Sequence, residues 1–273
     1  MTTGPWDATT RTRQALRSGV ERIVAIGGDG TVNEVVNGFF DRGVIVNPDA
    51  ELAIIEAGTG GDLRKTLGIP SDSEAAVERI LAGTRRRVDV GRVRMVRSDG
   101  APVERLFINV SSFGLSGSTV RRVDGNPRFK RLAGGLAYVT AAAAEAMLYT
   151  PHPVRLSFDG GPPESLDLIA CAVCNARYFG GGLHVAPMAE PDDGWLDVIL
   201  IRTARKHELL ATIPALFTGR HLDKPWVRHA RIRTLRVEIE RAGPAVFVET
   251  DGESAGQLAA TFDLLPRALA FRC

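Results

Sequence analysis

Short apolar runs alternate with amphipathic stretches over the first ninety residues. Residues 22–26 (RIVAI) and 52–56 (LAIIE) are apolar runs of strand length, and a glycine-rich turn follows each one. Apolar side chains spaced three and four residues apart predict helices around these runs. We expect helices from Asp7 to the glycine at 19, over 31–40 and over 71–81, the last with a Ser71–Glu74 capping box. This alternation predicts a parallel, helix-flanked sheet.

The pattern changes at about residue 86, beyond which β-strand signals dominate. Residues 231–239 (RIRTLRVEI) alternate apolar and polar positions, which is typical of an antiparallel strand with one solvent-facing side. The expected strands are 87–96, 106–112, 154–158, 166–175, 196–202, 230–239, 245–249 and 258–264, with helices over about 128–148 and 204–217. The predicted fold class is therefore α/β plus β, an N-terminal helix-flanked parallel sheet followed by a C-terminal antiparallel β-rich domain.

The same change divides the chain into expected domains. We expect residues 1–86 to form an α/β domain, residues 87–265 to form a β-rich domain, and residues 266–273 to form a tail that can return to the first domain. The cleft between two such domains is the default place for a ligand. We expect the functional site there.

Composition and charge narrow the function classes. Hydrophobic residues make up 44% and charged residues 24% of the 273 positions, which is ordinary for a globular protein. Lys and Arg (34) against Asp and Glu (32) leave a net charge of +2, too balanced for a partner such as nucleic acid. The most apolar stretch, 132–149, is short for a membrane span and carries Glu145. The first ten residues are polar, unlike a secretory signal, so we expect a cytoplasmic protein with no transmembrane segment.

Two glycine-rich loops follow the first two expected strands. The first is Gly27-Gly28-Asp29-Gly30-Thr31 and the second spans 57–62 (AGTGGD). Glycines let the backbone approach a phosphate, and the N-terminus of the following helix favours an anion. Both loops would leave the same edge of a parallel sheet, which favours phosphate binding over a plain turn with a Thr31–Glu34 capping box. Asp29 can hold the Mg²⁺ that accompanies a nucleotide, or bond the nucleotide itself.

The first loop and its extension carry a family resemblance. Residues 27–38 (GGDGTVNEVVNG) look like the signature of the diacylglycerol kinase catalytic domain, in its soluble bacterial lipid kinase form. The shorter Gly-Gly-Asp-Gly is shared with NAD kinases and phosphofructokinases, whereas the extension is more specific. Supporting segments follow in order at 58–62, 87–91, 109–114, 175–182, 186–197 and 251–253.

The resemblance implies a fold like that of NAD kinases and diacylglycerol kinases, and transfer of the ATP γ-phosphoryl group to a lipid hydroxyl in phospholipid biosynthesis. It makes residues 1–86 the nucleotide-binding domain, truncated at its N-terminus, and residues 87–265 the lipid-substrate domain. Glu253 matches the proton acceptor, with Asp251 beside it, and Asp29 positions metal and nucleotide. The positions matching nucleotide contacts are Thr2, Gly28, Asp29, Gly30, Thr31, Val32, Asn33, Glu34, Gly58 and Thr59. Asp193, with backbone carbonyls at Glu190 and Trp195, matches a structural Mg²⁺ site.

Plain structural readings stand beside these roles. Asp251 and Glu253 are two residues apart, so on extended backbone they face the same side, and one can orient a metal or water while the other takes a proton. Asp251-Gly252 is equally a hairpin-turn signal between strands. Asp192-Asp193-Gly194 is by default a turn, although a hard cation suits one carboxylate and backbone oxygens.

The sequence departs from the family pattern in two places. The second loop usually reads Gly-Thr-x-Asn-Asp, and Gly61 replaces the Asn. The family also opens with a strand and an Asn-Pro-x-Ser-Gly loop, and two parallel strands are few for a covered sheet. We therefore expect that an N-terminal strand and phosphate loop are missing from this sequence, through a misplaced start or a shortened form.

The lipid side is less specific. The apolar stretch at 132–149, beside basic Arg128, Lys130 and Arg131, can rest on a membrane surface or wall an acyl chain, or simply cover the β-rich domain. We expect peripheral membrane contact. The sequence leaves open whether the protein forms a homodimer. The lipid itself, diacylglycerol or a relative, is not specified. The alternatives are a soluble-substrate kinase of NAD kinase type and a truncated, non-catalytic nucleotide- or lipid-binding protein.

Overall fold

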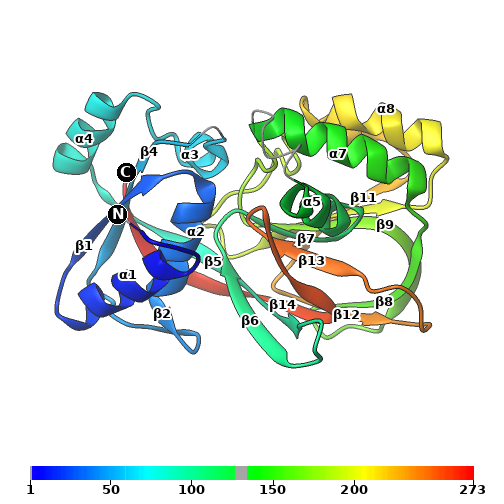
Figure 1. The fold of residues 1–273 in the computed structure, drawn as a ribbon, viewed down its shortest axis with the longest axis horizontal. Coiled ribbons are helices and arrows are strands. Elements are labelled where there is room, and N and C mark those ends of the chain that lie inside the picture. Colours follow the sequence, from blue (N-terminus) through cyan, green and yellow to red (C-terminus); the bar gives the residue numbers. More distant parts are fainter. Residues whose placement is uncertain (1, 59, 127–133) are drawn as a thin grey trace.

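Two halves follow one another along the chain and are joined by long strands (Figure 1). The structure is a computed structural model that describes residues 2–58, 60–126 and 134–273. The N-terminal half contains α1 (Asp7–Arg17), β1 (Arg22–Gly27), α2 (Asp29–Gly38), β2 (Phe40–Asp41), β3 (Val44–Ile45), β4 (Glu51–Glu56), α3 (Asp62–Leu67) and α4 (Ser73–Ala82). The C-terminal half contains β5 (Arg85–Val96), β6 (Pro102–Phe107), β7 (Val110–Gly114), α5 (Leu115–Gly125), α7 (Gly134–Leu148), β8 (His152–Phe158), β9 (Glu164–Cys174), β10 (Leu196–Arg202), α8 (Lys206–Leu216), the 3-10 helix η1 (Arg220–Asp223), β11 (Val227–Ile232), β12 (Thr234–Ile239), β13 (Phe247–Thr250) and β14 (Glu253–Arg272).

Parallel pairing is confined to one end of the main sheet. β1 pairs with β4 in parallel from Arg22↔Glu51 to Gly27↔Glu56, and the end of β14 adds a second parallel pair at Ala270↔Glu51. The other strand pairs among the described residues are antiparallel. The prediction of a separate parallel sheet is therefore not confirmed, because strands of the C-terminal half continue into the N-terminal half and make one twelve-stranded sheet.

The strand that makes this connection is β14, twenty residues long. It pairs with β5 from Gln257↔Val96 to Arg272↔Arg85, with register shifts near 257–261 and 265–269. Such irregularities bend a strand, and here the bend carries Phe271 into the N-terminal core. The expected strand at 258–264 and the expected tail at 266–273 thus belong to one continuous element.

Each half has its own apolar core. Val36, Phe39, Leu52 and Phe271 are buried among the residues of the N-terminal core. In the C-terminal half Phe113 stacks on Phe262 at 6.0 Å between ring centroids, inside the β-rich core. Helices α5, α7 and α8 cover one face of that half (Figure 1). Within the described ranges no helix is both long and apolar enough to cross a membrane.

Several element boundaries differ from those predicted, because a side chain redirects the backbone. Asp72, not Ser71, caps α4 by accepting the Ala75 N–H at 2.9 Å. The expected strand at 230–239 divides into β11 and β12, because Asp159 Oδ1 accepts the N–H groups of Arg233 and Thr234, both at 2.8 Å. The expected strand at 106–112 divides into β6 and β7. The first part of the predicted helix at 128–148 lies outside the described residues.

Candidate active site

The two glycine-rich loops touch each other through their backbones. β1 and β4 are parallel neighbours, so the loops after them leave the same edge of the sheet. A Cβ atom added to Gly58 would lie 2.5 Å from Gly28 Cα and 2.8 Å from Glu56 Oε1. No side chain fits at that distance. The loops therefore form one continuous backbone wall, and that approach is open only to glycine.

Asp29 fastens the second loop to the start of α2. Its carboxylate accepts the N–H groups of Asp62 at 3.1 Å and Leu63 at 3.3 Å, and so caps α3 from 33 residues away. An added Cβ on Gly60 would meet Asp29 Oδ2 at 2.8 Å. The half-buried carboxylate thus shapes the backbone wall that the two loops form. It also keeps lone pairs for a cation or a nucleotide group, since a carboxylate has about four acceptor positions.

Asp62 brings a third loop to the same place, which the sequence reasoning missed. Its Oδ2 accepts the Gly181 N–H at 2.8 Å, and its Oδ1 accepts from Lys65 Nζ at 3.0 Å. Burial raises the pKa of Asp62, and the nearby Asp29 carboxylate adds to the shift. The signal was present in the sequence as the aspartate that ends the second glycine loop, but its partner at 181 is 119 residues away.

Asp251 is a hub that joins three parts of the chain. Its carboxylate accepts the N–H groups of Ile108, Asn109 and Val110 at 2.9–3.0 Å, together with Asn33 Nδ2 at 2.7 Å. Burial raises the pKa of Asp251 to about 6, while these four donors favour its charged form. Asp251 therefore holds α2, the β6–β7 loop and the β13–β14 turn together.

Glu253 lies beside this hub and faces α2. A Cβ added to Gly30 would sit 3.0 Å from Glu253 Oε1, so this oxygen rests against the first turn of the helix. Burial raises the pKa of Glu253 to about 7, and the carboxylates of Glu34 and Asp251 add to the shift. No hydrogen bond joins it to another of the described side chains. A half-buried carboxylate with a pKa near 7 and a free oxygen is suited to accept a proton.

The side chains of the other α2 residues predicted to contact the nucleotide, Val32, Asn33 and Glu34, contact other parts of the protein. Val32 is buried in the N-terminal core, and Asn33 donates to Leu106 O at 3.1 Å as well as to Asp251. The Glu34 carboxylate accepts the N–H groups of Trp6 at 2.9 Å and Ala8 at 3.1 Å, and so caps α1. The specific part of the motif therefore positions α2.

The other residues predicted to contact the nucleotide lie partly at the cleft and partly on the surface. Gly28 and Gly58 line the cleft described below, and Thr31 is half-buried against Gly27. Thr2 is exposed ahead of α1. Thr59 lies outside the described residues.

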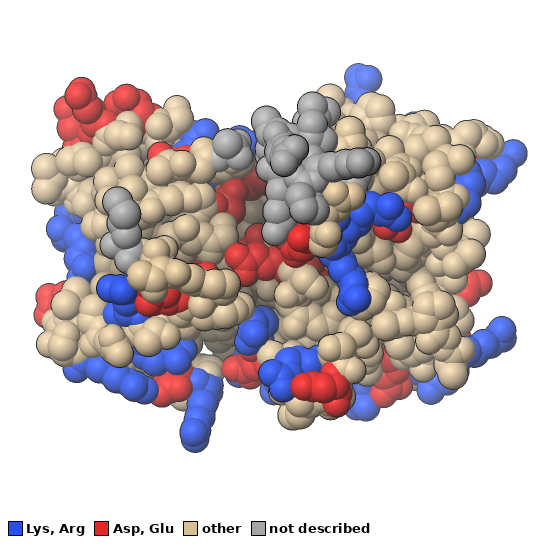
Figure 2. All heavy atoms as spheres, in the orientation of Figure 1, with Lys and Arg blue, Asp and Glu red and all other residues tan. Residues whose placement is uncertain are grey.

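A cleft of about 370 Å³ lies between the halves, and Glu253 directly follows Gly252, one of its lining residues. Figure 2 shows acidic side chains gathered in this hollow. Its lining residues are Gly28, Asp29, Gly58, Gly60 and Asp62 from the N-terminal half, and Asn109, Val120, Val123, Tyr138, Phe179, Gly180, Gly181, Asp251 and Gly252 from the C-terminal half. Asn109 Oδ1 is buried and has no hydrogen-bond partner among the described residues, which leaves it available to a ligand.

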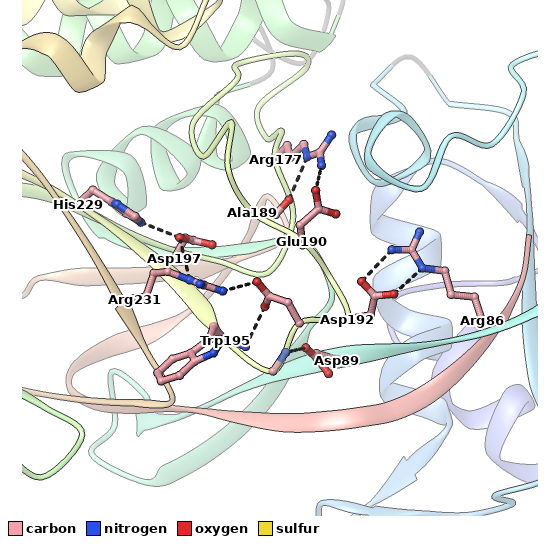
Figure 3. Close-up of polar contacts among 12 residues, drawn as sticks. Arg86, Asp89, Arg177, Ala189, Glu190, Asp192, Trp195, Asp197, His229 and Arg231 are labelled. Atoms are coloured by element: carbon pink, nitrogen blue, oxygen red, sulfur yellow. Dashed lines mark hydrogen bonds and ion pairs between the residues drawn. The ribbon is translucent and has the colours of Figure 1, made fainter.

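The segment predicted to hold a structural Mg²⁺ is arranged differently (Figure 3). Asp193 Oδ1 accepts the Trp195 N–H at 3.0 Å, and its Oδ2 pairs with Arg231. Arg86 binds Asp192 through two nitrogens, at 2.8 and 2.9 Å, and Arg177 pairs with Glu190.

A cation at Asp193 would have to displace Arg231. No cluster of three or more His, Cys, Asp or Glu side chains suited to a metal occurs in the part of the chain that the structure describes. The predicted site has one carboxylate and two backbone carbonyls, and here the Arg231 guanidinium pairs with that carboxylate, so the ion stays a prediction.

Comparison with known proteins agrees with the two-part organisation. Residues 1–93 match the diacylglycerol kinase catalytic domain, and residues 109–273 match the YegS C-terminal NAD kinase beta sandwich-like domain. Both halves thus define a kinase of the lipid kinase class. The chain belongs to the diacylglycerol kinase family, in its YegS-like form.

Individual relatives have the same arrangement. The chain is 30% identical over 256 residues to the diacylglycerol kinase of Mycobacterium tuberculosis, covering 93% of this chain and 77% of that protein. It is 26% identical over 262 residues to the diacylglycerol kinase of Bacillus subtilis, covering 96% and 80%.

Solved structures show the same fold. A diacylglycerol kinase structure from Bacillus anthracis superposes with a TM-score of 0.70 at 23% identity, covering 99% of this chain and 82% of the other. Yeast NADH kinase complexed with NADH gives a TM-score of 0.51 at 11% identity, covering 95% and 62%. The predicted likeness to both kinase folds is confirmed.

Proposed function

We propose that this kinase transfers the γ-phosphoryl group of ATP to the hydroxyl of a lipid, diacylglycerol or a related amphiphile. The observation that carries the proposal is the position of Glu253, against the first turn of α2 beside the paired glycine loops. The names of the relatives, diacylglycerol kinases, support the substrate class.

The wall of the cleft suits a polyphosphate. Gly28 and Gly58 bring bare backbone to the surface, and the N-terminus of α2 presents N–H groups and a positive dipole end. Asp29 is the carboxylate placed to hold a divalent cation that arrives with the nucleotide. Such an ion would neutralise charge on the phosphates.

A separate apolar cavity supports a lipid as acceptor. It has a volume of about 70 Å³ and lies under α5, α7 and α8, against β9 and β10. Its lining is almost entirely apolar, and Tyr138 and Phe179 border both this cavity and the polar cleft. Their rings meet edge to face at 5.2 Å between centroids. An amphiphile could place its hydroxyl in the cleft and the first few methylene groups of its chain in this cavity, which is too small for a whole acyl chain.

The transfer can then be written with Glu253, which follows the cleft-lining residue Gly252. The lipid hydroxyl oxygen attacks the γ-phosphorus, the bond from that phosphorus to the ADP oxygen breaks, and the hydroxyl proton passes to Glu253. Asp251 takes no proton in this scheme. Its four hydrogen bonds hold the turn from which Glu253 projects.

The test is transfer of labelled γ-phosphate from Mg·ATP to a panel of lipids in mixed micelles, with NAD included as a soluble acceptor. Wild type, Glu253→Gln and Glu78→Gln are compared, since Glu78 is an exposed glutamate on α4, in the N-terminal half. We expect one labelled lipid with wild type and Glu78→Gln, and label lower by about 10²-fold or more with Glu253→Gln. Labelled NAD with unlabelled lipids would contradict the proposal.

Contact with a membrane surface is a further part of this proposal. The basic residues Arg128, Lys130 and Arg131 lie outside the described residues, so its support is the sequence and the apolar cavity. We expect the chain to float with vesicles that contain anionic lipid and to stay behind with neutral vesicles. Equal recovery in both cases would contradict it.

A further inference from the structure

A buried glutamate lies one turn away from the proposed base. Glu249, in β13, has no solvent exposure. Its Oε2 accepts the Gly252 N–H at 2.8 Å, and its Oε1 is hydrogen-bonded to Ser112 on β7. Its backbone carbonyl accepts from Ser111 Oγ at 2.7 Å. This carboxyl group is not part of the two glycine-rich loops, and the proposed proton transfer does not involve it.

The group that it holds is the tip of the β13–β14 hairpin. Thr250 pairs with Glu253, and the two residues between them form the turn. Asp251 has φ 48° and Gly252 has φ 87°, the positive values that a two-residue type I′ turn requires. Asp and Gly are preferred at these two positions, so the local sequence favours the turn, and its contacts fix where it lies against the neighbouring strands. Gly252 N–H is the donor next to Glu253, and Glu249 is its acceptor.

We propose that Glu249 is a positioning residue for the phosphoryl transfer. By accepting the Gly252 N–H and pairing with Ser112, it fixes the tip of the hairpin and thereby the place of Glu253 against Gly30. This inference rests on the proposed function, because it assigns Glu253 the proton. Glu249 thus anchors the turn to β7 through Ser112, whereas Asp251 anchors it to α2 through Asn33.

The surroundings of Glu249 favour its uncharged form. The titratable groups that face it are Asp251 from the turn, Cys174 from β9 and Tyr138 from α7, and none of them carries a positive charge. Burial raises the pKa of Glu249 to about 8, so the carboxyl group is mostly protonated at pH 7. A glutamine can therefore reproduce its hydrogen bonds, whereas an apolar side chain of the same length cannot.

The decisive pair of variants is Glu249→Gln and Glu249→Met. Both keep the side-chain length, and only the first keeps an acceptor for Gly252. We expect kcat of Glu249→Gln within about threefold of wild type, and kcat of Glu249→Met lower by about 10- to 100-fold, with KM for ATP changed little. Equal kcat in the two variants would overturn the inference. If Glu249→Met does not fold, Ser112→Ala replaces it, with an expected loss of about three- to tenfold.

A second readout does not depend on turnover. Carbon-13 NMR of the glutamate carboxyl groups, with the Glu253 signal assigned by its loss in Glu253→Gln, follows the titration of the proposed base directly. We expect the Glu253 pKa to stay near 7 in wild type and Glu249→Gln, and to fall by about one unit or more in Glu249→Met. An unchanged pKa in Glu249→Met would overturn the inference. A chain with this shift but no transfer to lipid would instead count against the proposed function alone.

Discussion

Two short acidic segments, 251–253 and 190–193, look alike in the sequence and differ in what surrounds them. In the second segment arginines neutralise the acids: Arg177 pairs with Glu190, Arg86 with Asp192 and Arg231 with Asp193 (Figure 3). In the first segment the partners are backbone N–H groups and the Asn33 amide, and Glu253 rests against α2.

The difference is visible in the charge state of the acids. The Arg86 guanidinium lowers the pKa of Asp192, whereas burial raises the pKa of Glu253 to about 7. A carboxylate that accepts a proton at neutral pH has to be taken out of water without being paired with a fixed cation. Of the two segments, 251–253 is the one with a carboxyl group, Glu253, that meets both conditions, which supports the proposed division into a chemical and a structural segment.

Replacing the proposed base should have the largest effect. In Glu253→Gln the side chain keeps its size and loses its proton affinity, so we expect kcat to fall by about 10²- to 10⁴-fold, with KM for ATP nearly unchanged. Steady-state kinetics of ATP-dependent lipid phosphorylation measures both constants. Retention of more than about a tenth of the wild-type kcat would remove the distinction between the two segments.

The pH dependence should sharpen the contrast. A base with a pKa of about 7 must be deprotonated to act, so kcat/KM should rise about tenfold per pH unit below 7 and level off above it. Wild-type rates between pH 5.5 and 8.5 give this profile. The residual activity of Glu253→Gln should lack this acidic limb, and a limb that persists in the variant would assign the titration to another group.

The two segments should change the free energy of unfolding in opposite directions as pH rises. Glu253 should lower it, and Asp192 should raise it. The pKa of Glu253 is raised from 4.5 to about 7 in the folded chain, so its contribution to stability is full below pH 4.5 and is lost as pH rises through 7. The loss is on the order of 3 kcal/mol. Denaturant unfolding at pH 5 and pH 8 should show a smaller decrease in Glu253→Gln than in wild type. An equal decrease in wild type and Glu253→Gln would show that the titration of Glu253 does not cause the loss of stability.

The sequence predicts the local parts of the site well. Val32, Val35, Val36 and Phe39 repeat at helical spacing after a glycine turn, so α2 and the first loop follow from neighbours in the chain. Asp251-Gly252 is a hairpin signal, and a hairpin turn is present there.

The parts that could not be predicted depend on partners far along the chain. α3 begins where it does because Asp29 caps it, and β6 ends where the N–H groups of Ile108 and Asn109 turn to Asp251, 143 and 142 residues away. The hub role of Asp251 needs those donors in place. Local spacing carries no information about them, so the supporting role of Asp251 is seen only in the folded chain, and the role of Glu253 stays a proposal.

The ion pair between Arg86 and Asp192 should have a modest effect. Arg86 and Asp192 are each about one-third exposed, at 35% and 33%, so water screens their attraction. A double-mutant cycle with Arg86→Met and Asp192→Asn should give a coupling of about 0.5–1 kcal/mol in unfolding free energy. Because the pKa of Asp192 is lowered, this coupling is present above pH 3.8 and is lost as pH falls below it. A coupling that grows with acid would be inconsistent with the pairing.

The smallest effect is expected at Asp193. Arg231 already pairs with its carboxylate, and the Trp195 N–H occupies the other oxygen, so Asp193→Asn removes one exposed ion pair. We expect kcat within about twofold of wild type and a stability loss below about 1 kcal/mol. Melting curves with and without MgCl₂, in the absence of ATP, should shift equally in wild type and Asp193→Asn. If Mg²⁺ stabilises wild type and Asp193→Asn abolishes that stabilisation, the ion displaces Arg231. The 190–193 segment would then be a metal site and not only a set of ion pairs.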